Sequence, residues 1–346
     1  MDFSNDLIQW YLHHKRDLPW RKTTHPYPVW LSEIMLQQTR VAQGLPYFLR
    51  FIDAFPTVND MAAAPEEQVL KLWQGLGYYS RARNLHATAK QVAFDMGGKF
   101  PDSYAGLLKL KGVGDYTAAA IASISYGENV PVVDGNVYRV LSRVFGIETD
   151  ISSSGAKKEF TQIAAGLMPA GRASDFNQAM MEFGALQCVP KSPNCGICIF
   201  NAHCAAYTTG RVNSLPVKLK KQKVTNRFFN YLIIKDANGN SIINRRGEKG
   251  IWHGLYEFPL LETETLTPET ETLALIQQYN TGTGAKKTIT LLHPDLIIHK
   301  LSHQKLHICF WEVSIDSVEP EALDFEAIKQ YPFPIVIYNF IEKHWQ

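Results

Sequence analysis

The most constraining feature of the chain is a group of four cysteines, Cys188, Cys195, Cys198 and Cys204, with the spacing C-x6-C-x2-C-x5-C. Without an export signal, disulfides are not expected here. Four thiols this close together are typical of a metal ion or an iron–sulfur cluster. Zinc sites usually pair two CxxC units, and this segment has one, so we expect a 4Fe–4S cluster. Zinc and unligated thiols stay open as alternatives.

Composition excludes several classes of protein. The chain has 346 residues, 45% of them hydrophobic and 20% charged, with a formal net charge of +2. This is the profile of an ordinary globular protein of two or three domains. No apolar run approaches the roughly 18 residues of a membrane span, and no secretory signal is visible at the N-terminus. We therefore expect no membrane segment, no disulfide framework, and a cytoplasmic location.

Charge is distributed unevenly and suggests where the domains meet. Residues 211–227 carry six basic side chains and no acidic one, whereas residues 228–346 carry 10 basic and 15 acidic ones. We therefore predict domains at 1–210 and 228–346 with a basic linker at 211–227. The linker could lie against a polyanion, or it could simply be solvated.

The two predicted domains differ in their sequence pattern. Apolar residues near helical spacing at 30–38 and 69–73 predict a mainly helical first domain. The tail has the aromatic and β-branched run 228–234, a turn at 236–240 and a second strand candidate at 306–313. With a helix expected at 269–279, the tail is predicted to be an α+β domain. Cys309, within the second strand candidate, is expected to pack in its core.

Glycines at positions 112 and 114 predict a tight turn between two helices. The segment Leu110-Lys-Gly-Val-Gly-Asp-Tyr-Thr-Ala118 joins an apolar helix end to an Ala-rich run. Backbone N–H groups at the start of the second helix would form an anion site that suits a DNA phosphate, with Lys111 beside it. A plain helix–helix turn is the alternative.

Two acidic residues stand in apolar surroundings. Asp134 lies between a Val pair and Gly135, and Glu33 lies in an apolar helical stretch. Asp134 could simply be the N-cap of a helix over 136–144, and Glu33 could lie on an exposed face. Alternatively, two carboxyl groups in different environments could divide acid and electrostatic roles around a glycosidic bond.

The order of the hairpin, the aspartate and the four-cysteine loop resembles the helix-hairpin-helix DNA glycosylases that carry an iron–sulfur cluster. Within them, the segments 30–41 (WLSEIMLQQTRV), 75–84 (GLGYYSRARN) and 133–140 (VDGNVYRV) are similar to the adenine DNA glycosylases, the MutY family. The resemblance extends from about Leu18 to Tyr207 and is weaker in the tail. It implies two helical lobes with a DNA-facing cleft, one lobe containing the hairpin and the other the cluster.

The resemblance also implies roles for individual residues. Glu33 would protonate the flipped-out adenine and later activate water, Asp134 would stabilise the sugar cation, and Tyr116 and Asn136 would support them. Adenine would be held by Trp20, Arg21, Leu36 and Gln178. DNA would be contacted or intercalated by Gln38, Tyr78, Lys111, Gly112, Val113 and Gly114.

Tyr116 separates this chain from a sister activity. In the endonuclease III branch the corresponding residue is a lysine that forms a Schiff base with the sugar. A phenol cannot form an imine, so the resemblance implies a monofunctional glycosylase. An endonuclease III-like glycosylase/lyase and a non-catalytic damage-binding protein are the rival hypotheses.

The tail resembles the 8-oxoguanine-recognition domain of the same family, which has a Nudix-like fold, chiefly at 250–259 (GIWHGLYEFP). Leu260 stands where a Nudix hydrolase has its first glutamate, so no pyrophosphatase activity is expected. Ser302 and His303 match the loop that senses the oxidised guanine, although Leu301 departs from its pattern; an ordinary loop is the alternative. The resulting hypothesis is a monomeric enzyme that removes adenine from mispairs with 8-oxoguanine or guanine in duplex DNA.

Overall fold

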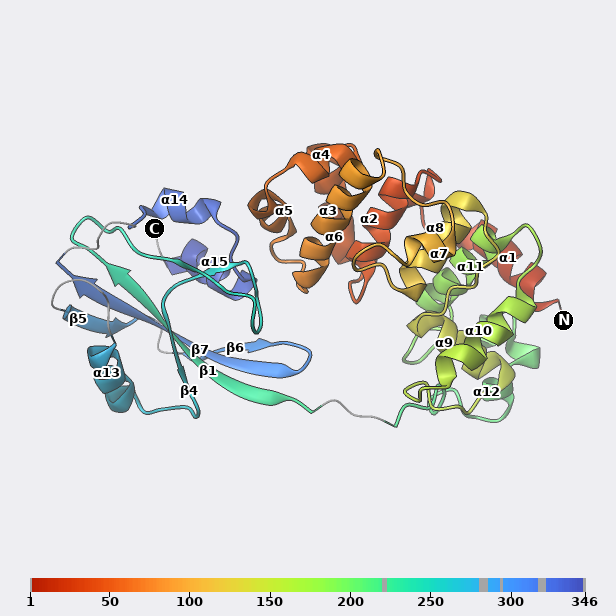
Figure 1. The fold of residues 1–346 in the computed structure, drawn as a ribbon. Coiled ribbons are helices and arrows are strands. Elements are labelled where there is room, and N and C mark those ends of the chain that lie inside the picture. The colour runs from red at the N-terminus through yellow and green to blue at the C-terminus, as the bar shows by residue number, and fades with distance from the viewer. Residues whose placement is uncertain (1, 220–222, 280–285, 293–294, 317–321, 345–346) are drawn as a thin grey trace. The chain divides into compact units, whose positions relative to one another are not determined.

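The computed structural model describes residues 2–219, 223–279, 286–292, 295–316 and 322–344. The chain divides into two units. Figure 1 shows the fold, coloured by residue number from red to blue. Unit 1 comprises Met1–Ala63 and Asn84–Lys220, and unit 2 comprises Ala64–Arg83 and Lys221–Gln346. Each unit is described by itself below.

The regular elements in the described part of unit 1 are all helices. One helix, α6 (Ser80–Lys90), begins among the last residues that belong to unit 2 and continues into unit 1. The other elements of unit 1 are α1 (Phe3–His14), η1 (Pro19–Arg21), α2 (Pro26–Leu36), α3 (Val41–Ala54), α4 (Val58–Ala63), η2 (Gln91–Asp95), α7 (Tyr104–Leu107), α8 (Asp115–Tyr126), α9 (Gly135–Phe145), α10 (Ala156–Leu167), α11 (Ala173–Leu186), η3 (Cys195–Ile197), η4 (Asn201–His203) and α12 (Ala205–Thr208).

The helix α2 lies deep in unit 1. It begins at Pro26, which suits a first helical turn because proline lacks an N–H, and its residues from Tyr27 to Met35 are almost all buried. A helix that is apolar on every side must be surrounded by other elements, here including α3 and α8. The predicted helical stretch extended to Gln38, but α2 ends at Leu36 because the backbone turns out of the helix at Gln37, which has a ψ of 115°, and Gln38 has a φ of 56°.

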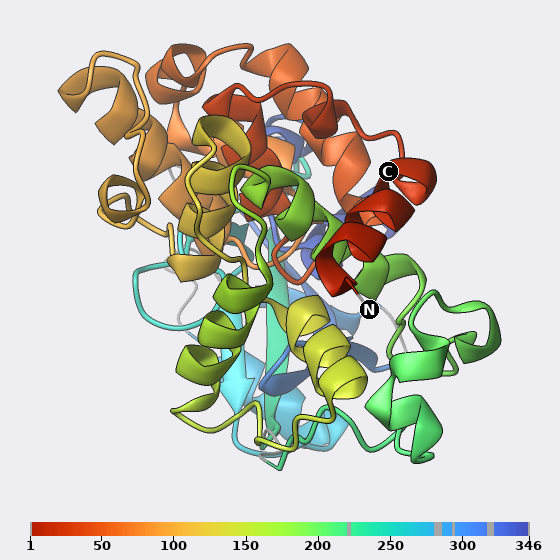
Figure 2. The same cartoon turned by 90° about the vertical axis from the view of Figure 1, so that its right-hand side faces the viewer.

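Helix α11 lies among several other helices of unit 1. It packs against α1, α8 and α9, although α1 is far away in the sequence (Figures 1 and 2). The core around α11 includes Leu7 of α1, Val140 of α9, Phe160 of α10 and Phe183 of α11, all at most 1% exposed. This packing is what brings residues from the chain's beginning and middle to one place.

Asn177 on α11 fixes the segment that leads to Asp134. This side chain is 1% exposed, accepts a hydrogen bond from Val132 N at 3.0 Å, and donates to Val130 O and Ser123 Oγ, each at 2.9 Å. One amide thus satisfies a backbone N–H and a backbone carbonyl in a segment that has no regular secondary structure.

Unit 2 has a mixed β-sheet with helices on both faces. Its elements are α5 (Glu66–Trp73), β1 (Thr225–Lys235), β2 (Asn244–Arg245), β3 (Tyr256–Glu257), β4 (Leu260–Thr263), α13 (Glu269–Gln278), β5 (Lys286–Leu291), β6 (Ile297–Lys300), β7 (Gln304–Ile315), α14 (Phe325–Gln330) and α15 (Ile335–His344).

The long strands β1 and β7 form the middle of this sheet. They pair in parallel from Thr225↔Gln304 to Lys235↔Ser314, and the order is β4-β1-β7-β5, with β6 also on β7. Alternate residues of β1 point to opposite faces: Tyr231 packs in a cluster with Phe340 of α15, and Leu232 packs in a cluster with Ile276 of α13. Burial on both faces explains why the run that predicted this strand is apolar except at Asn230.

Residues 64–83 belong to unit 2 through specific contacts. Lys71 Nζ on α5 donates to the Tyr331 carbonyl oxygen at 3.1 Å, and the Phe333 amide donates to Gln74 Oε1 at 3.0 Å. Tyr256 donates its hydroxyl to Glu67 at 2.6 Å.

The fold class predicted from the sequence, a helical first part followed by an α+β domain, is confirmed. The expected turn at 236–240 is present, with an isolated bridge between Lys235 and Ser241. Cys309 lies on β7 and packs at the edge of the α13-side core. In the predicted linker, Leu215 is 3% exposed and packs in unit 1; residues 220–222 of that linker lie outside the described residues.

No helix in the described part of the chain combines the length and the apolar character needed to cross a bilayer.

Replacement of Asn177 by leucine is expected to destabilise unit 1. The change keeps a similar side-chain volume but leaves the Val132 N–H and the Val130 carbonyl buried without partners, at a cost of roughly 1–3 kcal/mol each. We expect a fall in Tm of about 5 °C or more in thermal unfolding followed by circular dichroism. Asp175→Asn, an exposed change on the same helix, is the control and should stay within about 1 °C. Equal Tm values for both variants would contradict this account.

Candidate active site and cysteine pocket

Unit 1 contains a cavity of about 520 Å³ between α2, α8, α9, α11 and the segment before α2. Its lining brings together residues that are up to 169 positions apart, from Arg16 to Ala185. All four predicted catalytic residues and all four predicted adenine-pocket residues line it: Trp20, Arg21, Glu33, Leu36, Tyr116, Asp134, Asn136 and Gln178. The structure therefore assembles the whole candidate set in one place.

Glu33 is a buried acid on the cavity wall. Its side chain is on α2 and only 7% of the residue is exposed, while the Tyr116 hydroxyl donates a 2.6 Å hydrogen bond to Glu33 Oε2. Burial raises the pKa of Glu33 to about 7, although the Tyr116 hydrogen bond acts in the opposite direction. Near neutral pH this carboxyl can therefore either give or take a proton, as a general acid–base requires.

Asp134 is both the N-cap of α9 and a member of the cavity wall. Its Oδ1 accepts from the Asn136 and Val137 amides at 2.9 and 2.8 Å, and its Oδ2 accepts from Asn136 Nδ2 at 2.7 Å. Burial raises the pKa of Asp134, and these three hydrogen bonds oppose the rise by stabilising the carboxylate. The capping role considered from the sequence is thus present, and the same geometry holds a carboxylate against the cavity.

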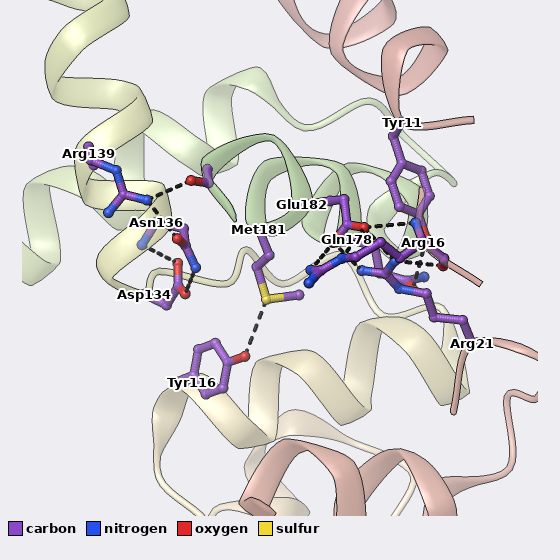
Figure 3. Close-up of polar contacts among 11 residues, drawn as sticks. Tyr11, Arg16, Arg21, Tyr116, Asp134, Asn136, Arg139, Gln178, Met181 and Glu182 are labelled. Carbon is purple, nitrogen blue, oxygen red and sulfur yellow. Dashed lines mark hydrogen bonds and ion pairs between the residues drawn. The ribbon is translucent and has the colours of Figure 1, made fainter. Parts of the chain in front are cut away.

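The side chain of Asn136, which donates to Asp134, is also held by Arg139. Its Oδ1 accepts from Arg139 Nη2 at 2.8 Å, and the same nitrogen donates to the Gly184 carbonyl oxygen at 2.7 Å (Figure 3). A Cβ at Gly184 would lie 2.5 Å from the Cβ of Asn136, so only glycine allows α11 to approach α9 this closely.

Sequence reasoning missed a charged cluster on the same wall. Glu182 of α11, 1% exposed, lies between the guanidinium groups of Arg16 and Arg21 (Figure 3). Beside it, the Tyr11 hydroxyl donates to Gln178 Oε1 at 3.1 Å. The available signal was an acidic residue within the apolar pattern of residues 173–186, which resembles the setting of Glu33.

The predicted hairpin joins α7 to α8. Gly112 has a φ of 75°, and a Cβ there would lie 2.6 Å from the Cβ of Asn84. Gly114 is the N-cap of α8, so free N–H groups of the first turn start at this point, while Val113 is buried. Lys111 is exposed beside them.

The two residues expected to enter the duplex share an unusual backbone conformation. Gln38 in unit 1 and Tyr78 in unit 2 have φ values of 56° and 49°, although neither is glycine. Both are exposed, Tyr78 to 47%. Such conformations cost free energy and cluster at functional sites.

The loop between β6 and β7 contains the residues expected to sense the oxidised base. Ser302 and His303 are exposed, and the Ser302 Oγ lies 2.6 Å from the Tyr78 hydroxyl within unit 2. The His303 carbonyl oxygen accepts from the Thr225 amide at 2.9 Å, which holds the loop to the start of β1.

The four clustered cysteines line a second pocket of unit 1. Cys188, Cys195, Cys198 and Cys204 all face it, together with Arg143, whose Nη1 lies 3.5 Å from Cys188 Sγ. Burial, with a smaller effect from the other three thiols, raises the pKa of Cys198 to about 11. No group of three or more potential ligands among the described residues is arranged to hold a single metal ion. A shared pocket of four thiols matches the donor set of a cluster in which each thiolate binds a different iron.

Comparison with known proteins now identifies the class of protein. Residues 31–165 match the model of the HhH-GPD superfamily base excision DNA repair proteins, and residues 230–343 match the NUDIX domain. Among solved structures, a thermostable thymine-DNA glycosylase is 30% identical with a TM-score of 0.56, over 60% of this chain and 95% of that one. An endonuclease III–DNA covalent intermediate shares the fold with a TM-score of 0.53 at 22% identity, over 60% of this chain and 94% of that one.

Sequence relatives define the family. An adenine DNA glycosylase of Buchnera aphidicola is 34% identical over 88% of this chain and 84% of its own length. Adenine DNA glycosylases of Rattus norvegicus and Homo sapiens are 34% and 32% identical over 92% of this chain, and 71% and 68% of their own lengths. The chain belongs to the adenine DNA glycosylase family.

The elevated pKa of Glu33 can be measured directly. We expect a carboxyl band that titrates near pH 7 in the pH-difference infrared spectrum and is absent from Glu33→Gln. Tyr116→Phe should raise the pKa further, because it removes a hydrogen bond that stabilises the carboxylate. Tyr126→Phe, which changes a hydroxyl on the same helix that bonds the Phe100 carbonyl, is the control. A band that titrates near pH 4.5 in the wild type would contradict the burial argument.

Proposed function

We propose that this protein is a monofunctional adenine DNA glycosylase that removes adenine mispaired with 8-oxoguanine or guanine and leaves an abasic site. The observation that supports this most strongly is the cavity in which Glu33 and Asp134 lie together with Tyr116. A protonatable acid and a hydrogen-bonded carboxylate are the pair needed to break a bond between a base and its sugar. Because Tyr116 takes the place of a nucleophilic lysine, the chemistry ends at the abasic site.

Adenine would reach this cavity only after it leaves the base stack. Trp20 and Leu36 supply apolar wall, and Arg21 and Gln178 supply polar groups that can bond the edges of the base. Glu33 would then protonate the ring N7, which makes the base a better leaving group. The same carboxylate would next accept a proton from the attacking water.

Asp134 would stabilise the positive charge that develops on the sugar as the bond breaks. Its three N–H donors leave the carboxylate in a fixed orientation, so no reorganisation is needed during the reaction. Asn136, held by Arg139, would keep both Asp134 and a water molecule in position.

The four cysteines would hold a 4Fe–4S cluster. Bound there, the cluster would supply structure by joining the segment after α11 to α12. Arg143 would stabilise the loop around it through its hydrogen bonds to the Val189 and Pro190 carbonyl oxygens, at 2.8 and 3.0 Å.

Double-stranded DNA is the proposed partner of a monomeric protein. The N–H groups at the start of α8 and Lys111 would bind a backbone phosphate, while Gln38 and Tyr78 would enter the duplex near the mispair. In unit 2, Ser302 and His303 would bond the oxidised guanine, close to Tyr78. We propose a cytoplasmic location, with the protein bound to chromosomal DNA.

Incubation with a duplex that has one adenine opposite 8-oxoguanine tests the function. We expect strand breaks only after alkali, for adenine opposite 8-oxoguanine or guanine and not opposite thymine. Glu33→Gln and Asp134→Asn should each lower the single-turnover rate at least about 100-fold, and the second keeps the helix cap. Glu128→Gln, an acid outside the cavity, should excise at the wild-type rate. Breaks without alkali would indicate a lyase, and tight binding without excision would indicate a damage-binding protein.

Purified protein should contain about four irons per chain and absorb visible light. Cys198→Ser should lose most of the iron and lower the Tm, because one of four ligands is removed. Cys309→Ser, in unit 2, should keep the full iron content. One zinc per chain without iron would instead support the alternative considered from the sequence.

A further inference from the structure

Glu182 is a buried charged residue on the cavity wall to which the proposed reaction assigns no role. Glu182 accepts from the backbone amide and Nε of Arg16, each at 2.9 Å, and from Arg16 Nη2 at 2.6 Å. It also accepts from Arg21 Nη1 at 2.9 Å and from Arg21 Nη2 at 2.7 Å. A single carboxylate thus bonds two guanidinium groups at once, as Figure 3 shows.

This cluster fixes the orientation of Arg21 beside Glu33. Arg21 Nη1 also donates to the Arg16 carbonyl oxygen at 3.1 Å, so both of its N–H bonds are used. The Nε–H and one Nη2–H have no acceptor among the described residues. These two N–H groups are the donors that Arg21 can offer to a base, and they keep one position only while Glu182 holds the guanidinium plane.

The cluster also sets the charge close to Glu33. Arg16 and Arg21 carry two positive charges, and Glu182 balances one of them. Burial raises the pKa of Glu33, and the negative charge of Asp134 adds to this rise. The attraction of Arg21 lowers the pKa because it favours the carboxylate. The arginines outweigh the effect of burial and bring the pKa of Glu182 down to about 2, so Glu182 is ionised at neutral pH.

We propose that Glu182 is a positioning residue of the reaction: it holds Arg16 and Arg21 against the cavity wall and balances their charge, so that Arg21 offers hydrogen-bond donors to the base without excess positive charge beside Glu33. The proposal rests on adenine excision as the function. It differs from a purely structural salt bridge because it links a residue outside the reacting pair to the protonation of Glu33.

The charged and polar groups that face Glu33 come from several elements. Tyr116 on α8 and Asp134 before α9 face it within the cavity, and Arg21 approaches from η1. Arg40 also lines the cavity. The variants below leave Tyr116, Asp134, Arg21 and Arg40 in place and change the charge only at Glu182 and Arg16. A shift in the pH profile therefore reports the charge of the cluster.

Single-turnover excision of adenine opposite 8-oxoguanine, measured from pH 6 to 9, tests the proposal. In the wild type, the rate should fall as pH rises through the pKa of Glu33, because the acid form is lost. In Glu182→Gln, an unbalanced charge favours the carboxylate, so this fall should move about one pH unit lower. In Glu182→Gln combined with Arg16→Gln, the original charge returns and the fall should move back toward its wild-type position.

Two further variants separate charge from shape. Glu182→Asp keeps the charge but shortens the side chain, so we expect a lower rate with an unshifted pH profile. Asp175→Asn on the same helix, in an exposed pair with Arg172, should match the wild type in both respects. A Glu182→Gln profile without a shift, or a double variant shifted further than the single one, would overturn the proposal.

The pH-difference infrared band of Glu33 gives the same answer without turnover. Its titration should move to lower pH in Glu182→Gln and back in the double variant, whatever reaction the cavity performs. If the wild type excises no adenine while this band shifts as expected, the proposed function fails and the charge balance stands. If excision occurs and the band does not move, the Glu182 proposal fails alone.

Discussion

A carboxyl group in a protein interior loses its hydration, and this loss must be met by a proton, by hydrogen bonds or by an opposite charge. Around the cavity of unit 1, three acids compensate for the loss of hydration in three different ways. Glu33 takes up a proton near neutral pH, Asp134 accepts three N–H bonds at the start of α9, and Glu182 pairs with two arginines. Three environments therefore give three acids distinct protonation behaviour within a single cavity, which is the condition for dividing acid, electrostatic and positioning roles.

The arrangement depends on helix packing, because the three acids come from α2, the start of α9 and α11. Gly184 lets α11 lie close to α9, and Asn177 holds the segment before Asp134. The small buried side chains of Ala118, Ala119, Ala120 and Ala122 likewise allow α8 to lie close to α2. The chemistry of the site is thus supported by contacts that involve no reacting atom.

Much of this could be predicted from local patterns. Asp134 was recognised as a possible cap, and the apolar run of β1 as a strand, because hydrogen bonding at helix ends and burial follow local rules. The Glu182 cluster could not be predicted, since its partners are more than 160 residues away in the sequence. The end of α2 was also missed, because the positive φ of Gln38 has no glycine to mark it. Long-range ion pairs and strained non-glycine residues leave little trace in sequence periodicity.

Unit 2 is built from two segments that are far apart in the sequence, and this has a consequence for folding during synthesis. Residues 64–83 leave the ribosome early, but the partners of Lys71 and Gln74 near residues 331 and 333 come roughly 260 residues later. At about 5–20 residues per second, α5 waits on the order of 10–50 s before its contacts in unit 2 can form. The strand β1 likewise waits for β7. During synthesis, unit 1 can therefore complete its cavity while α5 still lacks its partners in unit 2.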